Sequence, residues 1–216
     1  VLGRPGTLYY QKEMNLLIGQ LYFEKKNYQK AAPLLQAYVN SSDKVTKEIM
    51  YELSYCYYDA NDLEKAIEGF KQLSTEKDSM GQNSMYLLGD CYLRTNQKAN
   101  ARNAFQYSAY NNSNKLQQQI SRFNYAKLSY ELGYQDIALG EMKKYLNDYP
   151  NSEYDTEAKE ILVSLLANTN NFADALQMYE SFDKPTAAMQ KVYPRILYGR
   201  AVELVNDQQI KRADDL

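Results

Sequence analysis

The sequence repeats one pattern of residues at a fixed interval. Three small residues, Gly19, Ser54 and Gly89, lie 35 residues apart, and each is followed three positions later by a tyrosine. A period of about 20 to 50 residues is typical of an architecture in which similar units stack on one another. This interval constrains the fold more than any other feature of the chain.

Each unit has the residue pattern of two helices. Leu53 and Tyr57 lie four positions apart on one helix face, and Ala66 and Phe70 do the same on the following segment. The intervening residues 59–62 are Asp, Ala, Asn and Asp, which favour a turn and can cap the second helix. The sequence therefore predicts a helical hairpin in each unit, in which the small residues let the two helices approach closely.

The units resemble the tetratricopeptide repeat, whose pattern is Trp, Leu-Gly, Tyr, Ala, Phe and a closing Pro. The third unit matches this pattern, with Met in the place of Trp, at Met85, Leu88, Gly89, Tyr92, Ala101 and Phe105. The resemblance implies an all-α fold, a right-handed superhelical solenoid of antiparallel helix pairs with about five and a half repeats. The expected repeats are approximately 12–43, 47–78, 82–114, 119–152 and 156–185, with a partial repeat at 194–216.

We expect one solenoid domain over residues 1–216, because no Pro-rich or Ser-rich linker divides the chain. Pro33 falls inside a predicted helix, and its missing N–H predicts a bend there. The chain lacks an initial Met and stops within a helical pattern, so we expect an excerpt of a longer protein.

Composition argues against several classes of function. The chain contains no His, no glycine-rich phosphate loop and no spaced set of metal ligands. We therefore expect no catalysis, no cofactor and no metal. Its net charge is -2 with the two signs interleaved, which argues against nucleic acid as a partner. No apolar run is long enough for direct membrane insertion.

Cys56 and Cys91 are the only cysteines and occupy the same position of neighbouring units. A disulfide needs Cα atoms within about 7 Å, whereas packed helices lie about 10 Å apart. We expect two buried free thiols, since a buried free Cys behaves as a small apolar side chain.

A second stripe on the first helices carries the candidate site. Tyr51, Tyr55 and Tyr58 follow i, i+4, i+7 and are rotated by about one residue from the buried face. In tetratricopeptide proteins these positions line a concave groove that holds a peptide, so the resemblance implies a peptide-binding groove. The matching positions of later units are Tyr86, Asp90, Arg94, Phe123, Lys127 and Tyr130.

These residue types suit peptide recognition. Tyrosine offers a large flat contact area and a hydroxyl, while Asp90, Arg94 and Lys127 would orient a partner by pairing with its charges. The inward rings could equally pack on one another across adjacent helices, and this alternative stays open.

The resemblance implies a non-catalytic scaffold that binds a peptide or protein and belongs to a larger assembly protein. One alternative is a carbohydrate or peptidoglycan binder, because tyrosine rings can stack on sugar faces. Another is a structural segment whose groove is filled by flanking repeats or by a second copy.

The C-terminal part of the chain carries two further expectations. Its last predicted helix is apolar enough to need a neighbour, which indicates a homo-oligomer formed through this helix; the residues are Ile196, Leu197, Tyr198, Val202, Leu204 and Val205. The connector at 149–152 is similar to those of bacterial envelope-associated family members. That similarity implies a periplasmic or cell-envelope location, with a cytoplasmic one as the alternative.

Overall fold

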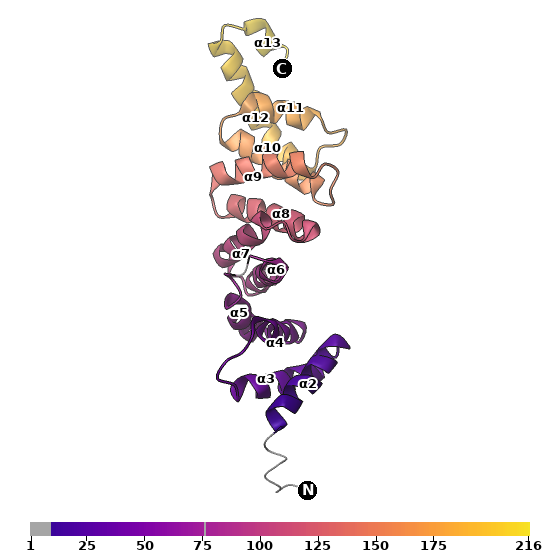
Figure 1. Cartoon of the computed structure of the whole chain (residues 1–216). Coiled ribbons are helices and arrows are strands. Elements are labelled where there is room, and N and C mark those ends of the chain that lie inside the picture. The colour runs from indigo at the N-terminus through magenta and orange to yellow at the C-terminus, as the bar shows by residue number, and fades with distance from the viewer. Residues whose placement is uncertain (1–9, 76) are drawn as a thin grey trace. The chain divides into compact units, whose positions relative to one another are not determined.

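The computed structural model describes residues 10–75 and 77–216, and within them it contains twelve α-helices and no strand (Figure 1). The predicted all-α fold of paired helices is confirmed. The helices form two compact units, one that extends to Gln118 and one from Gln119 to Leu216. The expectation of a single domain over residues 1–216 stays a prediction.

The first unit contains three helix pairs, and two of them begin ahead of the predicted repeats, at Gln11 rather than 12 and at Ser79 rather than 82. Within each pair the helices pack on each other, and the second helices of the first two pairs also contact the first helix of the pair that follows. The pairs are α2 (Gln11–Glu24) with α3 (Tyr28–Asn40), α4 (Lys47–Asp59) with α5 (Leu63–Lys71), and α6 (Ser79–Arg94) with α7 (Lys98–Tyr110). The first helices α2 and α4 touch, as do α4 and α6.

Helix α8 (Lys115–Glu131) begins in the first unit and ends in the second. The other helices of the second unit are α9 (Gln135–Asp148), α10 (Asp155–Asn168), α11 (Phe172–Glu180), α12 (Ala187–Asn206) and α13 (Ile210–Asp214). Helix α10 packs on both α9 and α11, and α12 packs on α10, α11 and α13. Helix α12 begins ahead of the expected start at 194, because Thr186 caps it by accepting the N–H of Met189.

A three-residue turn joins the two helices of every pair. Its middle residue has a positive φ, between 56° and 83°, at Lys26, Asn61, Asn96, Gly133, Asn170 and Gln208. The next residue donates its N–H to the carbonyl five positions earlier, over 2.7 to 2.9 Å. This pattern ends the first helix in a Schellman motif and reverses the chain, and Asn or Gly adopts it with the least strain.

In the first two repeats, a side chain caps the start of the second helix. In the second repeat, the Asp62 carboxylate accepts the N–H of Lys65 over 3.4 Å, and in the first repeat Asn27 accepts the N–H of Lys30 over 3.3 Å. The predicted turn and cap at residues 59–62 are confirmed.

The helices of a pair approach closely where one of them has a small residue. A Cβ atom added to Gly69 would lie 1.9 Å from the Ser54 Oγ atom, and one added to Gly89 would lie 2.8 Å from the Phe105 ring. Atoms of real side chains do not approach this closely, so these positions exclude larger residues.

The structure also bears on the predictions for Pro33 and for the two cysteines. Helix α3 continues through Pro33 without a break, and α12 likewise continues through Pro194. Cys56 and Cys91 are both free and fully buried, as predicted. Burial raises the pKa of each thiol to about 12, so both stay protonated and unreactive at neutral pH.

Candidate functional site

The tyrosines of α4 belong to a run of ring contacts that crosses the first two repeats, which we name the aromatic ladder. Tyr55 meets the rings of Phe23 and Tyr28 edge to face, with centroids 5.9 and 5.1 Å away. Tyr51 and Tyr58, also on α4, have ring centroids within 6.5 Å of that of Phe70 on α5. The ladder consists of Phe23, Tyr28, Tyr51, Tyr55, Tyr58 and Phe70.

The α4 tyrosines are half-buried, so the alternative of ring packing is correct for much of their surface. Tyr86 follows the same arrangement on α6, where its ring lies 6.2 Å from that of Phe105 on α7. Rings that rest on the second helix of their own repeat are held in place, which leaves their outward edges in fixed positions.

Side-chain hydrogen bonds join each first helix to the next. The Tyr51 hydroxyl donates to the Asn83 carboxamide oxygen, and the Tyr58 hydroxyl donates to the Asp90 carboxylate, each over 2.8 Å. Gln20 of α2 donates to Glu52 of α4 over 3.1 Å. Each of these bonds links residues 32 positions apart, so the contact between α2 and α4 recurs between α4 and α6.

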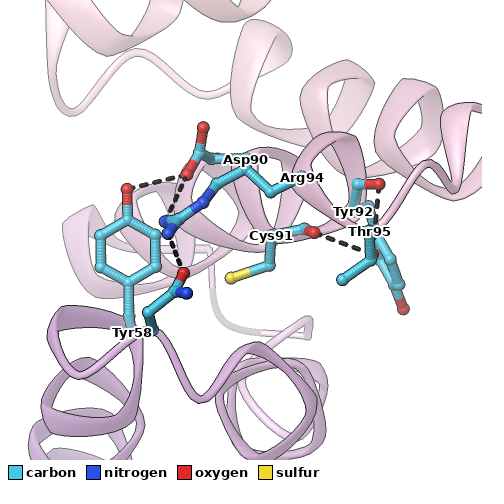
Figure 2. A network of polar contacts seen from close by, with 7 residues as sticks. Tyr58, Asp90, Cys91, Tyr92, Arg94 and Thr95 are labelled. Carbon is cyan, nitrogen blue, oxygen red and sulfur yellow. Dashed lines mark hydrogen bonds and ion pairs between the residues drawn. The ribbon is translucent and has the colours of Figure 1, made fainter.

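Asp90 and Arg94 form a small polar network with Tyr58 (Figure 2). The Arg94 guanidinium lies 5.4 Å from the centre of the Tyr58 ring and 3.4 Å from the Asp90 carboxylate. Arg94 also donates to Asn61 in the turn of the second repeat. The side chains of Arg94 and Asp90 remain 38% and 37% exposed, so both charges are paired and still reach the surface.

Burial changes the acidity of several of these groups. It raises the pKa of Tyr51 to about 12, with the neighbouring Tyr55 as a smaller cause. It also raises the pKa of Tyr58 to about 12, and the hydrogen bond to Asp90 adds to this shift. The pKa of Glu52 is raised by burial too, and the nearby carboxylates of α2 and α4 reinforce the change. Both phenols therefore stay protonated at neutral pH and can donate to Asn83 and Asp90.

A cavity of about 330 Å³ lies beside the pair of Tyr51 and Asn83. Its lining is mostly neutral and polar, with one thioether: Tyr51, Ser79, Met80, Asn83, Ser113, Asn114 and Gln117. A volume of this size is at the lower end of small-molecule sites and suits one side chain of a bound peptide.

Three predicted site residues lie in the second unit, and one of them is wrong. Phe123 is only 2% exposed, because its ring stacks on Tyr154 with centroids 4.4 Å apart. It belongs to the core and cannot contact a ligand. Lys127 pairs with Glu157 of α10 over 2.6 Å, and Tyr130 is partly buried against the core of this unit.

The sequence analysis did not identify several hydrogen-bond partners of these residues. Asn83, Asn61 and the pair of Gln20 and Glu52 were not singled out as partners of the tyrosines and charges. A separation of 32 or 33 positions between hydrogen-bonding residue types is the signal that could have found them.

Other classes of site have little support within residues 10–75 and 77–216. There, no group of three His, Cys, Asp or Glu side chains lies close enough to hold a metal ion. In the same part of the chain, no helix is both long and apolar enough to cross a bilayer.

Comparisons with known proteins agree with this architecture. A sequence model of the tetratricopeptide repeat matches residues 16–79 and 57–115. A MamA crystal structure is 17% identical, covers 88% of this chain and 96% of its own, and superposes with a TM-score of 0.58.

YrrB, described as a tetratricopeptide protein with an unusual peptide-binding site, is 16% identical, with coverages of 91% and 98% and a TM-score of 0.60. Among curated proteins, none matches the chain. Residues 16–115 are therefore similar to the tetratricopeptide repeat, and the chain shares the fold of these solved structures.

Proposed function

We propose that this protein is an interaction scaffold whose first unit binds a peptide or a protein segment on the inner face of α4 and α6. The tetratricopeptide fold supports an interaction scaffold, and YrrB is a relative in fold that has a peptide-binding site. The proposed contact residues are Tyr51, Tyr55, Tyr58, Tyr86, Asp90 and Arg94.

The observation that carries the proposal is the arrangement of Tyr58, Asp90 and Arg94. A ring, an anion and a cation are held by one another at the surface, where each remains accessible to a partner. Such a fixed array costs little entropy when a ligand binds. The cavity beside Tyr51 adds a place for one ligand side chain.

A peptide would contact the exposed parts of the ladder rings, because the hydroxyls of Tyr51 and Tyr58 already donate to Asn83 and Asp90. Tyr55 already meets other rings on several sides, so a ligand reaches only part of it. Packing and binding are therefore compatible roles for the same tyrosines. Lys127 and Tyr130 lie in the second unit, where Lys127 already pairs with Glu157, and their role as contact residues stays a prediction.

Selection from a random peptide library against the whole chain tests this proposal. Peptides that bind the inner face should lose about tenfold in affinity when Tyr55→Ala or Arg94→Glu is introduced, because hot-spot contacts of this kind typically cost more than 1 kcal/mol. Tyr134→Ala is the matched control, since Tyr134 is 49% exposed in the turn between α8 and α9. If no peptide is selected, or if every selected peptide ignores the inner-face variants, the proposal is wrong and the segment is structural.

A non-catalytic role without nucleic acid follows from the same reasoning. The charged residues of the proposed binding face, Asp90 and Arg94, have opposite signs and pair with each other, which offers no basic surface for phosphates. The location in a periplasm or cell envelope, with the cytoplasm as the alternative, rests on the connector at 149–152 alone and stays a prediction.

Self-association through α12 is part of the proposal. Tyr198, Val202 and Val205 lie at i, i+4 and i+7 and are 75%, 41% and 51% exposed, whereas Ile196 and Leu204 are buried. An apolar stripe on a helix favours contact with a matching stripe, and a second copy provides one by symmetry.

A further inference from the structure

A second cavity, of about 600 Å³, lies over helix α7 and shares no residue with the aromatic ladder. Four of its lining residues, Asn103, Gln106, Tyr107 and Tyr110, follow i, i+3, i+4, i+7 on one face of the helix. Lys77 and the residues at 111–112 border it from the adjoining loops. The volume is within the range of small-molecule binding sites.

The chemistry of the lining narrows the class of ligand. It contains four carboxamides and two phenol hydroxyls, and each of these groups can both donate and accept a hydrogen bond. A sugar hydroxyl has the same dual capacity. Among the described residues of the lining, Lys77 is the single charged one. A metal cation finds no anionic ligand among these residues, and a polyanion finds one cation.

Two aromatic side chains supply the apolar part of the cavity. Tyr110 is 54% exposed and Tyr107 is half-buried. Their rings are flat apolar surfaces with a polar end, which suits a ligand that presents C–H groups on one face and hydroxyls at its rim. The tyrosine rings match the C–H face of a pyranose, and the carboxamides match the hydroxyls at its rim.

The loop beside the cavity is held in a fixed conformation. The Asn111 carboxamide donates to the carbonyls of Lys77 and Asp78 over 3.1 and 3.2 Å and accepts from the N–H and hydroxyl of Ser113. Beneath it, the fully buried Gln82 donates to the Asn111 carbonyl over 2.9 Å. A preformed wall lowers the entropy cost of binding a small ligand.

Gln82 also anchors both ends of that loop. Its carboxamide donates to the carbonyls of Ser108 and Asn114, over 3.2 and 3.0 Å, and accepts the N–H of Asn114 over 2.6 Å. The buried carboxamide thus satisfies backbone groups that the end of α7 would otherwise leave unpaired.

From this lining we infer that the cavity over α7 binds a neutral oligosaccharide. Tyr107 and Tyr110 stack on sugar rings, and Asn103 and Gln106 bind vicinal hydroxyls. The inference is independent of peptide binding at α4 and α6, since the two sites share no residue.

Isothermal titration calorimetry on the whole chain tests this inference with maltohexaose, cellohexaose, xylohexaose, mannohexaose and chitohexaose. At least one of these should bind at millimolar concentration or below. Tyr110→Ala and Asn103→Ala should each weaken that binding by about tenfold, as expected for the loss of a stacked ring or of paired hydrogen bonds.

Two controls make the result specific. Tyr134→Ala removes a ring of similar exposure, 49%, from the turn between α8 and α9 and should leave the affinity unchanged. Tyr55→Ala should leave sugar binding unchanged even where it weakens peptide binding. The inference is overturned if none of the five saccharides binds at millimolar concentration, or if the one that binds does so equally well in Tyr110→Ala and Asn103→Ala.

Discussion

The Tyr58 hydroxyl of α4 donates a hydrogen bond to the Asp90 carboxylate of α6 over 2.8 Å, and so joins the first helices of two successive repeats. Arg94 completes the contact by lying against the Tyr58 ring while it pairs with Asp90. A hydrogen bond to a charged acceptor is stronger than one between neutral groups. This contact therefore contributes to the packing of the repeats and also shapes the proposed binding face.

A double-mutant cycle of Tyr58→Phe and Asp90→Asn should show that the two side chains are coupled. We expect each single variant to lower the free energy of unfolding by about 1 kcal/mol, and the double variant to lose less than the sum of the two. Urea denaturation followed by circular dichroism measures all four proteins. Strict additivity would mean that the hydrogen bond is absent in solution.

Stability should fall in alkaline solution partly because of Tyr58. Its pKa is raised to about 12 in the folded protein, against about 10 in an unfolded chain. The folded state binds this proton more tightly, so the contribution is fully present below pH 10 and is lost as the pH rises through 12. Urea unfolding across this range should show a steeper fall for the wild type than for Tyr58→Phe. Equal slopes would contradict the assignment.

Gly69 should tolerate no side chain. A Cβ there would lie 1.9 Å from Ser54 Oγ and 2.9 Å from Ser54 Cβ, so Gly69→Ala should destabilise the protein by about 1–3 kcal/mol. Adding Ser54→Gly removes both obstructing atoms and should restore part of the loss. The measurement is the free energy of unfolding of each variant.

Gly140 is the matched control, because no atom lies within 4 Å of a Cβ built at that position in α9. There the substitution Gly140→Ala should stabilise the protein by about 0.5–1 kcal/mol through helix propensity. A similar loss at both glycines would show that close packing is not the cause at Gly69.

The exposed stripe of α12 should control the mass of the protein in solution. Sedimentation at micromolar concentration should give a dimer for the wild type and a monomer for Tyr198→Ser with Val202→Ser, because the pair removes the apolar surface that a second copy would cover. Leu116→Ser is the control, since Leu116 is 63% exposed on α8. A monomeric wild type would exclude association through α12.

The period of 35 residues was sufficient to predict the helix pairs, since a turn residue with positive φ recurs at Lys26, Asn61 and Asn96 with the same step. The sequence also placed Tyr51, Tyr55 and Tyr58 on one stripe of α4. It did not reveal that their hydroxyls and ring edges are already engaged, because this depends on how far one helix is rotated against the next.

Phe123 shows why position in a repeat does not fix exposure. Its slot matches that of Tyr51 and Tyr86, but Tyr154, just before α10, stacks on it and closes the space. The connector that carries Tyr154 is longer than the turns within pairs, and its path could not be derived from helical periodicity. Similarly, Asp90 and Arg94 were expected to pair with charges of a bound partner. Their spacing of four residues lets them pair with each other instead.

Mapping a selected peptide by amide NMR tests the central claim most directly. The account predicts that saturating peptide shifts the signals of α4 and α6 around Tyr55, Asp90 and Arg94, and that signals on the outer face of α5 and α7 stay in place. Shifts confined to α5 and α7, with α4 and α6 unchanged, would contradict it.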